Sequence, residues 1–169
     1  ELGSTVYFKY ANDDYDNISE SEAEKKTLEE PVKWVGFKQA FFTSVIISDN
    51  APFSKNALVE TDFQHGSKVY VKNYLASLPL AYNHQSTQNY SMRLYFGPNH
   101  YQTLKKYAIG LENQINLGWK IFGWLNRFLV IPIFNFLAGF NMNYGIIILI
   151  LTVILKLLLL PIAYRTVLT

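Results

Sequence analysis

The stretch Met-Arg-Leu-Tyr-Phe-Gly-Pro at residues 92–98 separates two kinds of sequence in this chain. Its apolar residues alternate with others, so Met92, Leu94 and Phe96 would share one face of an extended strand. The Gly-Pro pair ends that strand, and a proline followed by Asn99 is a typical helix start. We therefore predict strands before this stretch and three helical segments after it.

Upstream, residues 31–97 predict several strands of an antiparallel sheet or sandwich. They are rich in Tyr, Phe, Val and Ile, and turn-forming clusters interrupt them at 49–52 and 83–89. Such punctuated runs are typical of β domains. Within them the run KVYVK at 68–72 has the period-two alternation of a strand. Residues 1–11 alternate in the same way, which extends the β prediction to the start of the chain.

Residues 12–30 differ from their surroundings because they are polar and strongly acidic. They contain too few apolar positions to bury one face of an element. We therefore expect a surface loop here, which could include a short helix near residues 20–28.

The charges are distributed unevenly. The chain has 13 Asp and Glu residues, and all but Glu112 lie at or before Asp62. From Asn113 onward the only charged residues are Lys120, Arg127, Lys156 and Arg165. A soluble domain rarely loses its carboxylates over its last third, so this distribution indicates membrane contact.

The first segment of this acid-free region is NLGWKIFGWLNRFL at residues 116–129. As a helix it places Asn116, Lys120 and Arg127 on one face. Its opposite face carries Leu117, Ile121, Trp124, Leu125 and Phe128. A helix packed on a soluble core would look similar, but the long apolar run at 144–163 favours a helix lying in the membrane interface. The candidate interfacial residues are Trp119, Lys120, Trp124, Arg127 and Phe128. Residues 130–140 are expected to be a connector at the outer interface.

Residues 144–163, YGIIILILTVILKLLLLPIA, predict a membrane-spanning helix. About 20 apolar residues at ~1.5 Å each cross the ~30 Å hydrocarbon core. Only Thr152 and Lys156 interrupt the run. The positive-inside tendency places Arg165, just after the span, in the cytoplasm.

Lys156 is the residue of this span that most suggests a function. It lies about thirteen residues, or ~20 Å, beyond Asn143, on the cytoplasmic side of the midplane. A lysine facing lipid there costs at least a few kcal/mol. The residues leave two interpretations open: the ammonium snorkels to the headgroups, or it faces a water-accessible cavity together with Thr152, one turn earlier.

Catalysis, cofactors and nucleic acid have no support in the sequence. The span contains no Ser that Lys156 could activate, and His65, His84 and His100 lack metal-ligand spacing. No glycine-rich phosphate loop is present. The net charge is only +2, and no basic stripe has interleaved aromatics. The lack of Cys excludes disulfides and thiolate metal sites. We therefore expect a protein that is not an enzyme and holds no cofactor or metal.

The features occur in an informative order: a strand end at 94–98, a short helix, an amphipathic stretch at 118–129, and the apolar run from 143 to 161. This order resembles the YidC family of membrane insertases. The aromatic stretch 34–42 is also similar to a family strand at the matching place. The resemblance covers most of the chain and is most specific from 95 to 161.

The resemblance implies an antiparallel periplasmic β-sandwich followed by α-helical membrane segments. It implies that Lys156, with Thr152, lies in a hydrophilic groove that is open to the cytoplasm and to lipid. The family residue at the position of Lys156 is usually Arg, so this chain keeps the charge but not the planar fork. The implied activity is that of an insertase and chaperone that draws acidic segments of incoming proteins into the groove. The implied partners are newly made membrane proteins and the phospholipid bilayer, and, through regions absent from this chain, the Sec translocon and the ribosome.

A second hypothesis, from another class, is a membrane-anchored periplasmic β-sandwich that binds a ligand such as carbohydrate. Its 12 Tyr and 12 Phe residues would suit either sugar stacking or sheet packing. A simple anchor has no need of a deep cation, so Lys156 distinguishes the two hypotheses.

The sequence also predicts boundaries. We expect an internal piece of a longer protein, because the chain begins without Met and inside an apparent strand. The predicted parts are a β domain at 1–98, a short helix and connector at 99–115, an interfacial helix and connector at 116–142, a transmembrane helix at 143–164 and a cytoplasmic start at 165–169. Residues 1–115 are expected in the periplasm of a bacterial cell with this protein in its inner membrane.

Overall fold

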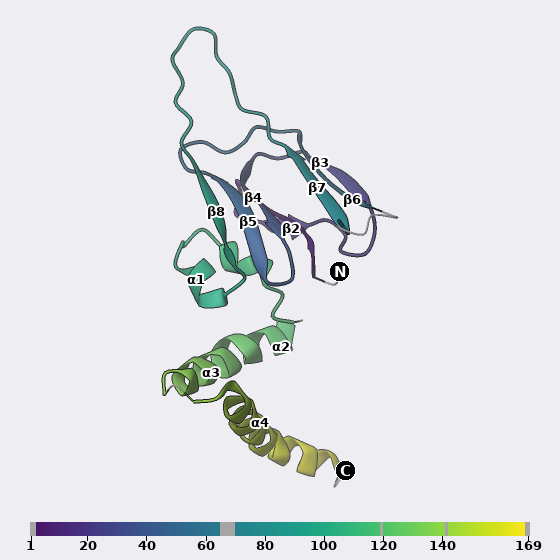
Figure 1. Ribbon diagram of the computed structural model, residues 1–169, viewed down its shortest axis with the longest axis vertical. Coiled ribbons are helices and arrows are strands. Elements are labelled where there is room, and N and C mark those ends of the chain that lie inside the picture. The colour runs from purple at the N-terminus through teal and green to yellow at the C-terminus, as the bar shows by residue number, and fades with distance from the viewer. Residues whose placement is uncertain (1–2, 65–69, 119, 141, 168–169) are drawn as a thin grey trace. The chain divides into compact units, whose positions relative to one another are not determined.

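The computed structural model describes residues 3–64, 70–118, 120–140 and 142–167. The chain forms two compact units, Glu1–Ile115 and Asn116–Thr169. Figure 1 labels most of their strands and helices.

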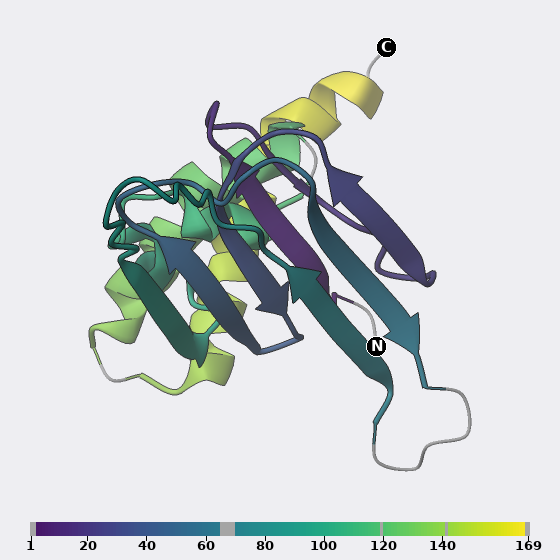
Figure 2. The same cartoon turned by 90° about the horizontal axis from the view of Figure 1, so that it is seen from above.

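The first unit is built from two antiparallel sheets (Figures 1 and 2). The larger has five strands in the order β2-β1-β4-β5-β8, and the smaller has three in the order β3-β6-β7. The strands are β1 (Thr5–Tyr10), β2 (Tyr15–Asn17), β3 (Glu24–Leu28), β4 (Val32–Lys38), β5 (Phe42–Ser48), β6 (Ala57–Phe63), β7 (Lys72–Ser77) and β8 (Met92–Pro98). The predicted antiparallel β-sandwich class is confirmed.

A hydrophobic core lies between the two sheets. Val6 and Phe8 of β1 and Val35 of β4 face it from the larger sheet. Ala57 and Val59 of β6 face it from the smaller sheet, and all five side chains are fully buried. The two-residue spacing within each strand is what places these side chains on one face. Full burial of each large apolar side chain contributes about 1.5–3 kcal/mol.

The other face of the larger sheet is covered by two short helical segments, α1 (Tyr101–Lys105) and the 3-10 turn η1 (Leu111–Gln114). Leu104 and Leu111 are fully buried there against Trp34 of β4. The central strands β1 and β4 of the larger sheet are therefore covered on both faces, by the second sheet on one side and by this helical segment on the other.

The loop predicted at residues 12–30 is wrong, because the region contains strands β2 and β3. The acidic composition hid a strand whose charges are paired across the sheet. Lys25 Nζ lies 3.2 Å from Glu60 Oε2 on β6. Alternation along β3 still buries Leu28 in the core. No helix forms near residues 20–28.

The strand predicted at residues 68–72 is misplaced. Residues 68 and 69 lie outside the described residues, and β7 begins only at Lys72. The register of β7 is set further along, where Tyr74 and Ala76 pack against the core. Burial of these alternate residues decides which residues pair with β6.

The face shared by Met92, Leu94 and Phe96 is present on β8, as predicted, but it is exposed. The exposed fractions of the three side chains are 43%, 63% and 72%. β8 lies at an edge of its sheet and pairs with β5. The alternation therefore identified strand β8 correctly. The face that carries Met92, Leu94 and Phe96 stays exposed because no other described element covers it.

The second unit is helical. The segment α2 (Lys120–Leu125), the π-helical turn η2 (Asn126–Val130) and α3 (Ile131–Ala138) follow one another without a break. After them, α4 covers Tyr144–Val167. The connector expected at residues 130–140 is therefore helical over α3. Pro132 lies near the start of α3, directly after the π-helical turn η2.

α3 and α4 pack against each other within this unit. The rings of Phe134 and Tyr144 are stacked, with centroids 6.1 Å apart and planes 7° from parallel. Ile147, near the start of α4, is fully buried. These contacts form a helical hairpin from the end of α3 to the beginning of α4.

Among the described residues, no helix combines the length and the apolar character that crossing a membrane requires. The helix predicted at 143–164 is present as α4, and its crossing of a membrane stays a prediction.

Candidate functional site

The two predicted groove residues lie one turn apart on α4. Thr152 Oγ1 donates a hydrogen bond of 2.7 Å to the Ile148 carbonyl, which satisfies the hydroxyl within the helix. Thr152 and Lys156 are both exposed. Because residues four apart share a helix face, the hydroxyl and the ammonium lie on the same side of α4.

No carboxylate of the second unit can neutralise Lys156, because the last acidic residue of the sequence is Glu112. Thr152 and Lys156 are thus a polar strip on a helix whose neighbouring residues are apolar. What the strip can do chemically is attract an anionic group and donate hydrogen bonds to it. The Thr152 hydroxyl donates its proton to the Ile148 carbonyl, so Lys156 does not act on it as a base here.

The predicted interfacial residues form a second cluster, around α2 and η2. Trp124 and Phe128 are 60% and 62% exposed, and their ring centroids lie 5.7 Å apart. Arg127 lies between them in sequence and is also exposed. Lys120 is the first residue of α2, and Trp119 lies outside the described residues.

Trp124, Arg127 and Phe128 line one hollow of about 280 Å³ together with Gly118 and Gly123. The sequence predicted that Arg127 and the two rings would lie on opposite faces. In the structure the cation and the aromatic rings instead border the same space.

The hollow is shaped by a loop that folds back onto the helix. Asn126 Nδ2 donates a 2.7 Å hydrogen bond to the Leu117 carbonyl. Gly118 has a φ of 97°, in the region that favours glycine. A Cβ on Gly123 would stand 2.8 Å from the Gly118 carbonyl oxygen, so only glycine lets the loop approach this closely.

Sequence reasoning missed this arrangement of Gly118, Gly123 and Asn126. The two glycines were the available signal, since glycine inside a helical pattern often marks a close backbone approach. The role of the two glycines depends on the conformation of the loop, and the periodicity of the sequence does not encode that conformation.

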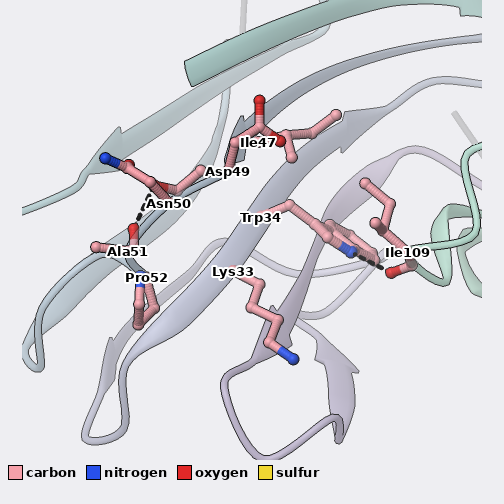
Figure 3. Close-up of a pocket in the computed structure, with 9 residues that line it drawn as sticks. Lys33, Trp34, Ile47, Asp49, Asn50, Ala51, Pro52 and Ile109 are labelled. Carbon is pink, nitrogen blue, oxygen red and sulfur yellow. Dashed lines mark hydrogen bonds between the residues drawn. The ribbon is translucent and has the colours of Figure 1, made fainter. Parts of the chain in front are cut away.

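A separate hollow of about 320 Å³ lies on the β unit, beside Trp34 of β4 and Pro52 (Figure 3). The carbohydrate hypothesis would need an aromatic ring in such a hollow with one face open to a sugar. Trp34 is only 1% exposed, and its indole Nε1 donates a 3.0 Å hydrogen bond to the Ile109 carbonyl. A ring held in this way packs the helical segment onto the sheet and offers no open face on which a sugar could stack.

Both charged residues that line this hollow are already paired: Lys33 Nζ lies 2.8 Å from Asp13 Oδ1, and Asp49 is bound by Arg93. Arg93 Nε donates to both oxygens of Asp49, at 2.9 and 2.8 Å, and Arg93 Nη2 donates to Oδ1 at 2.6 Å. The hydrogen bonds from Arg93 hold the pKa of the Asp49 carboxyl below its ordinary value. The pair links the residue that follows β5 to the neighbouring strand β8, and is better explained as structural than as ligand-binding.

The segment after β8 is fixed to the sheet by buried polar contacts that the sequence did not reveal. Thr43 Oγ1 donates a 2.9 Å hydrogen bond to Gln114 Oε1, and Gln114 is completely buried. Lys9 Nζ donates a 3.2 Å hydrogen bond to the Ile109 carbonyl. These contacts, with the one from Trp34, fix the last residues of the first unit against β1, β4 and β5.

Known proteins resemble this chain over most of its length. A family model described as "YidC periplasmic domain" matches residues 2–134. The chain is 37% identical over 166 residues to a protein of Amoebophilus asiaticus named "Membrane protein insertase YidC", covering 96% of this chain and 28% of that protein.

Two further relatives carry the same name. The one from Porphyromonas gingivalis is 38% identical over 171 residues, covering 96% of this chain and 27% of its own length. The one from Bacteroides fragilis is 34% identical over 165 residues, covering 94% and 26%. The chain thus spans little more than a quarter of the curated relatives it matches. On the sequence match and the two-sheet fold together, this chain belongs to the YidC family.

Proposed function

We propose that this chain is part of a membrane protein insertase and chaperone of the bacterial inner membrane. The names of its relatives and the match to a periplasmic family domain support this assignment. Residues 1–115 then lie in the periplasm. Residues 143–164 cross the bilayer, with Arg165 and the C-terminal end on the cytoplasmic side.

The observation that carries the mechanism is that Lys156 follows Thr152 by one turn, on the same face of α4. In the proposal this face lines a hydrophilic groove in the intact protein. Two opposite unit charges 4 Å apart attract by about 1 kcal/mol in water and about 4 kcal/mol at an effective dielectric constant of 20. A partly dehydrated groove therefore lets one cation recruit an acidic segment far better than an exposed lysine could.

The groove works without covalent chemistry. A hydrophilic segment of the incoming protein enters it near Lys156, while the adjoining apolar segment moves into lipid. The partners are newly made membrane proteins and the phospholipid bilayer. The Sec translocon and the ribosome are partners through parts of the longer relatives that this chain does not span.

A depletion and rescue experiment tests the charge. Cells depleted of the protein receive the intact gene with Lys156→Leu or Lys156→Arg, and insertion of a client with an acidic translocated segment is followed by protease protection. We expect Lys156→Leu to lower insertion at least tenfold. A tenfold change corresponds to ~1.4 kcal/mol, which is within what one charge in a partly dehydrated groove can supply. Lys156→Arg should retain insertion because the charge remains.

A matched control is Lys156→Leu combined with Leu157→Lys, which keeps the net charge but moves it about 100° around α4. The double variant should remain impaired, because the proposal needs the cation on the face of Thr152. Full rescue of cell growth and insertion by Lys156→Leu would remove the groove mechanism.

A further inference from the structure

The hollow between Trp124, Arg127 and Phe128 has no role in the proposed groove. It lies in α2 and η2, whereas the groove residues lie in α4. It combines a guanidinium, two exposed aromatic rings and a backbone loop that a hydrogen bond holds against the helix.

We infer that this hollow binds the phosphate of an anionic phospholipid headgroup, with the acyl chains passing over Trp124 and Phe128. The inference rests on the proposed membrane function, since it places α2 and η2 at a lipid surface. The sequence predicted only that this helix lies in the membrane interface. The inference adds the class of lipid that it binds and the position at which the lipid binds.

Charge complementarity favours an anionic lipid. Arg127 presents a planar donor fork that matches the geometry of a phosphate. No residue beyond Glu112 carries a carboxylate, so the second unit has only positive side chains to offer a headgroup. A zwitterionic lipid brings its own ammonium, which Arg127 repels, whereas an anionic lipid brings a net negative charge.

The aromatic pair supplies the apolar part of the site. Trp124 and Phe128 lie one turn apart, and their rings are tilted by 39° to each other at 5.7 Å. Large aromatic side chains prefer the boundary between headgroups and acyl chains. A lipid whose phosphate reaches Arg127 would therefore lay its glycerol and upper acyl carbons against these two rings.

The loop makes the hollow a shaped site. Because Asn126 holds the Leu117 carbonyl and Gly123 leaves room for Gly118, the loop forms a wall beside Arg127. The π-helical turn then places Arg127 and Phe128 in the wider part of the helix. Such turns recur at functional positions in helices.

Quenching of Trp124 fluorescence by brominated lipids tests the inference. The intact protein, with its other tryptophans (here Trp34 and Trp119) replaced by Phe, is reconstituted into phosphatidylcholine bilayers that contain either brominated phosphatidylglycerol or brominated phosphatidylcholine. We expect phosphatidylglycerol to quench Trp124 at about one fifth of the mole fraction that phosphatidylcholine requires. This ratio corresponds to ~1 kcal/mol for one arginine at an anionic surface.

Arg127→Gln should reduce this fivefold preference to parity, and Arg127→Lys should retain most of it. Equal quenching by both lipids in the parent protein, or an unchanged preference in Arg127→Gln, overturns the inference. If the Trp34→Phe protein does not fold, Trp34 is kept and the signal is taken as the difference from a Trp124→Phe protein. Insertion measured with the Lys156 variants is a separate readout, so failure here leaves the groove proposal standing.

Discussion

At the scale of single residues, Gln114 links the helical segment to the sheet. Its amide is fully buried, accepts a hydrogen bond from Thr43 and donates one of 3.3 Å to the Leu111 carbonyl. Gly36 lies directly beneath it, where a Cβ would stand 2.5 Å from Gln114 Oε1. The buried amide can only keep both bonds because position 36 has no side chain.

Gly36→Ala should therefore destabilise the protein by about 1–3 kcal/mol, since the displaced amide loses a buried hydrogen bond. The free energy of unfolding, measured by urea denaturation, checks the change. Gln114→Ala makes room at the same place, so adding Gly36→Ala to Gln114→Ala should cost clearly less than Gly36→Ala alone. Additive losses in the two variants would show that the two residues are not coupled.

The pairing of Asp49 with Arg93 gives a pH dependence whose sign can be stated. Arg93 holds the pKa of Asp49 below 3.8 in the folded protein. The ion pair between Asp49 and Arg93 therefore stabilises the folded protein at pH values above the pKa that Asp49 has in the unfolded chain. This stabilisation is lost as the pH falls through the lower pKa that Asp49 has in the folded protein. Arg93→Gln should raise the Asp49 pKa toward 3.8, which a carboxyl ¹³C NMR titration measures. A pKa that does not move would mean that Arg93 is not its main cause.

At the scale of elements, the π-helical turn η2 has an identifiable cause. Ile131 N–H donates to the Asn126 carbonyl, five residues back, and the next residue is Pro132. Proline cannot donate to the carbonyl of Phe128, and its ring would clash with that oxygen in a regular α-helix. Widening the preceding turn relieves this clash.

Pro132→Ala should convert η2 into a regular α-helical turn. The new N–H at 132 can bond to the Phe128 carbonyl, and Ile131 N–H would then bond to Arg127 instead of Asn126. A crystal structure or NMR hydrogen-bond couplings would show the change. Arg127 should rotate away from Trp124, and the preference for phosphatidylglycerol should fall with it. Persistence of the π-helical turn in the Ala variant would show that Pro132 is not its cause.

At the scale of the whole molecule, the two units have different sources of stability. Unit Glu1–Ile115 has its own core between two sheets, and a second cluster around Trp34. Unit Asn116–Thr169 is a set of helices whose apolar side chains are largely exposed. The first can bury its apolar surface internally, whereas the second needs an apolar surrounding to do so.

A chain ending at Ile115 should therefore fold alone and keep its antiparallel sheets. We expect its amide NMR spectrum to be dispersed, with protected amides in β1, β4 and β5. Its melting temperature should remain within a few degrees of that of the same domain in the longer chain. A chain ending before Gln114 is the matched control: it loses the buried contact with Thr43 and should melt several degrees lower.

The sequence by itself determined the type and order of most elements. The change from strands to helices at residues 92–98 was predictable because alternation and the Gly-Pro pair are local signals. The polar strip on α4 could be predicted in the same way, since Thr152 and Lys156 are four positions apart. Local signals failed to predict strand β3, because its charged residues suggested a loop. In the structure Lys25 of β3 is paired with Glu60 of the neighbouring strand β6.

Only the tertiary structure decided which surfaces meet. Gln114 bonds to Thr43 across 71 positions, and Trp34 to Ile109 across 75, so no window of sequence contains either contact. The hollow beside Arg127 depends on a shorter closure, in which Asn126 bonds to the Leu117 carbonyl nine positions earlier. Periodicity reports which face of an element is apolar, but it does not encode how the chain closes over that face. This is why the helical cover of the sheet, which closes over long distances, and the proposed lipid site, which depends on a local loop conformation, came from the structure.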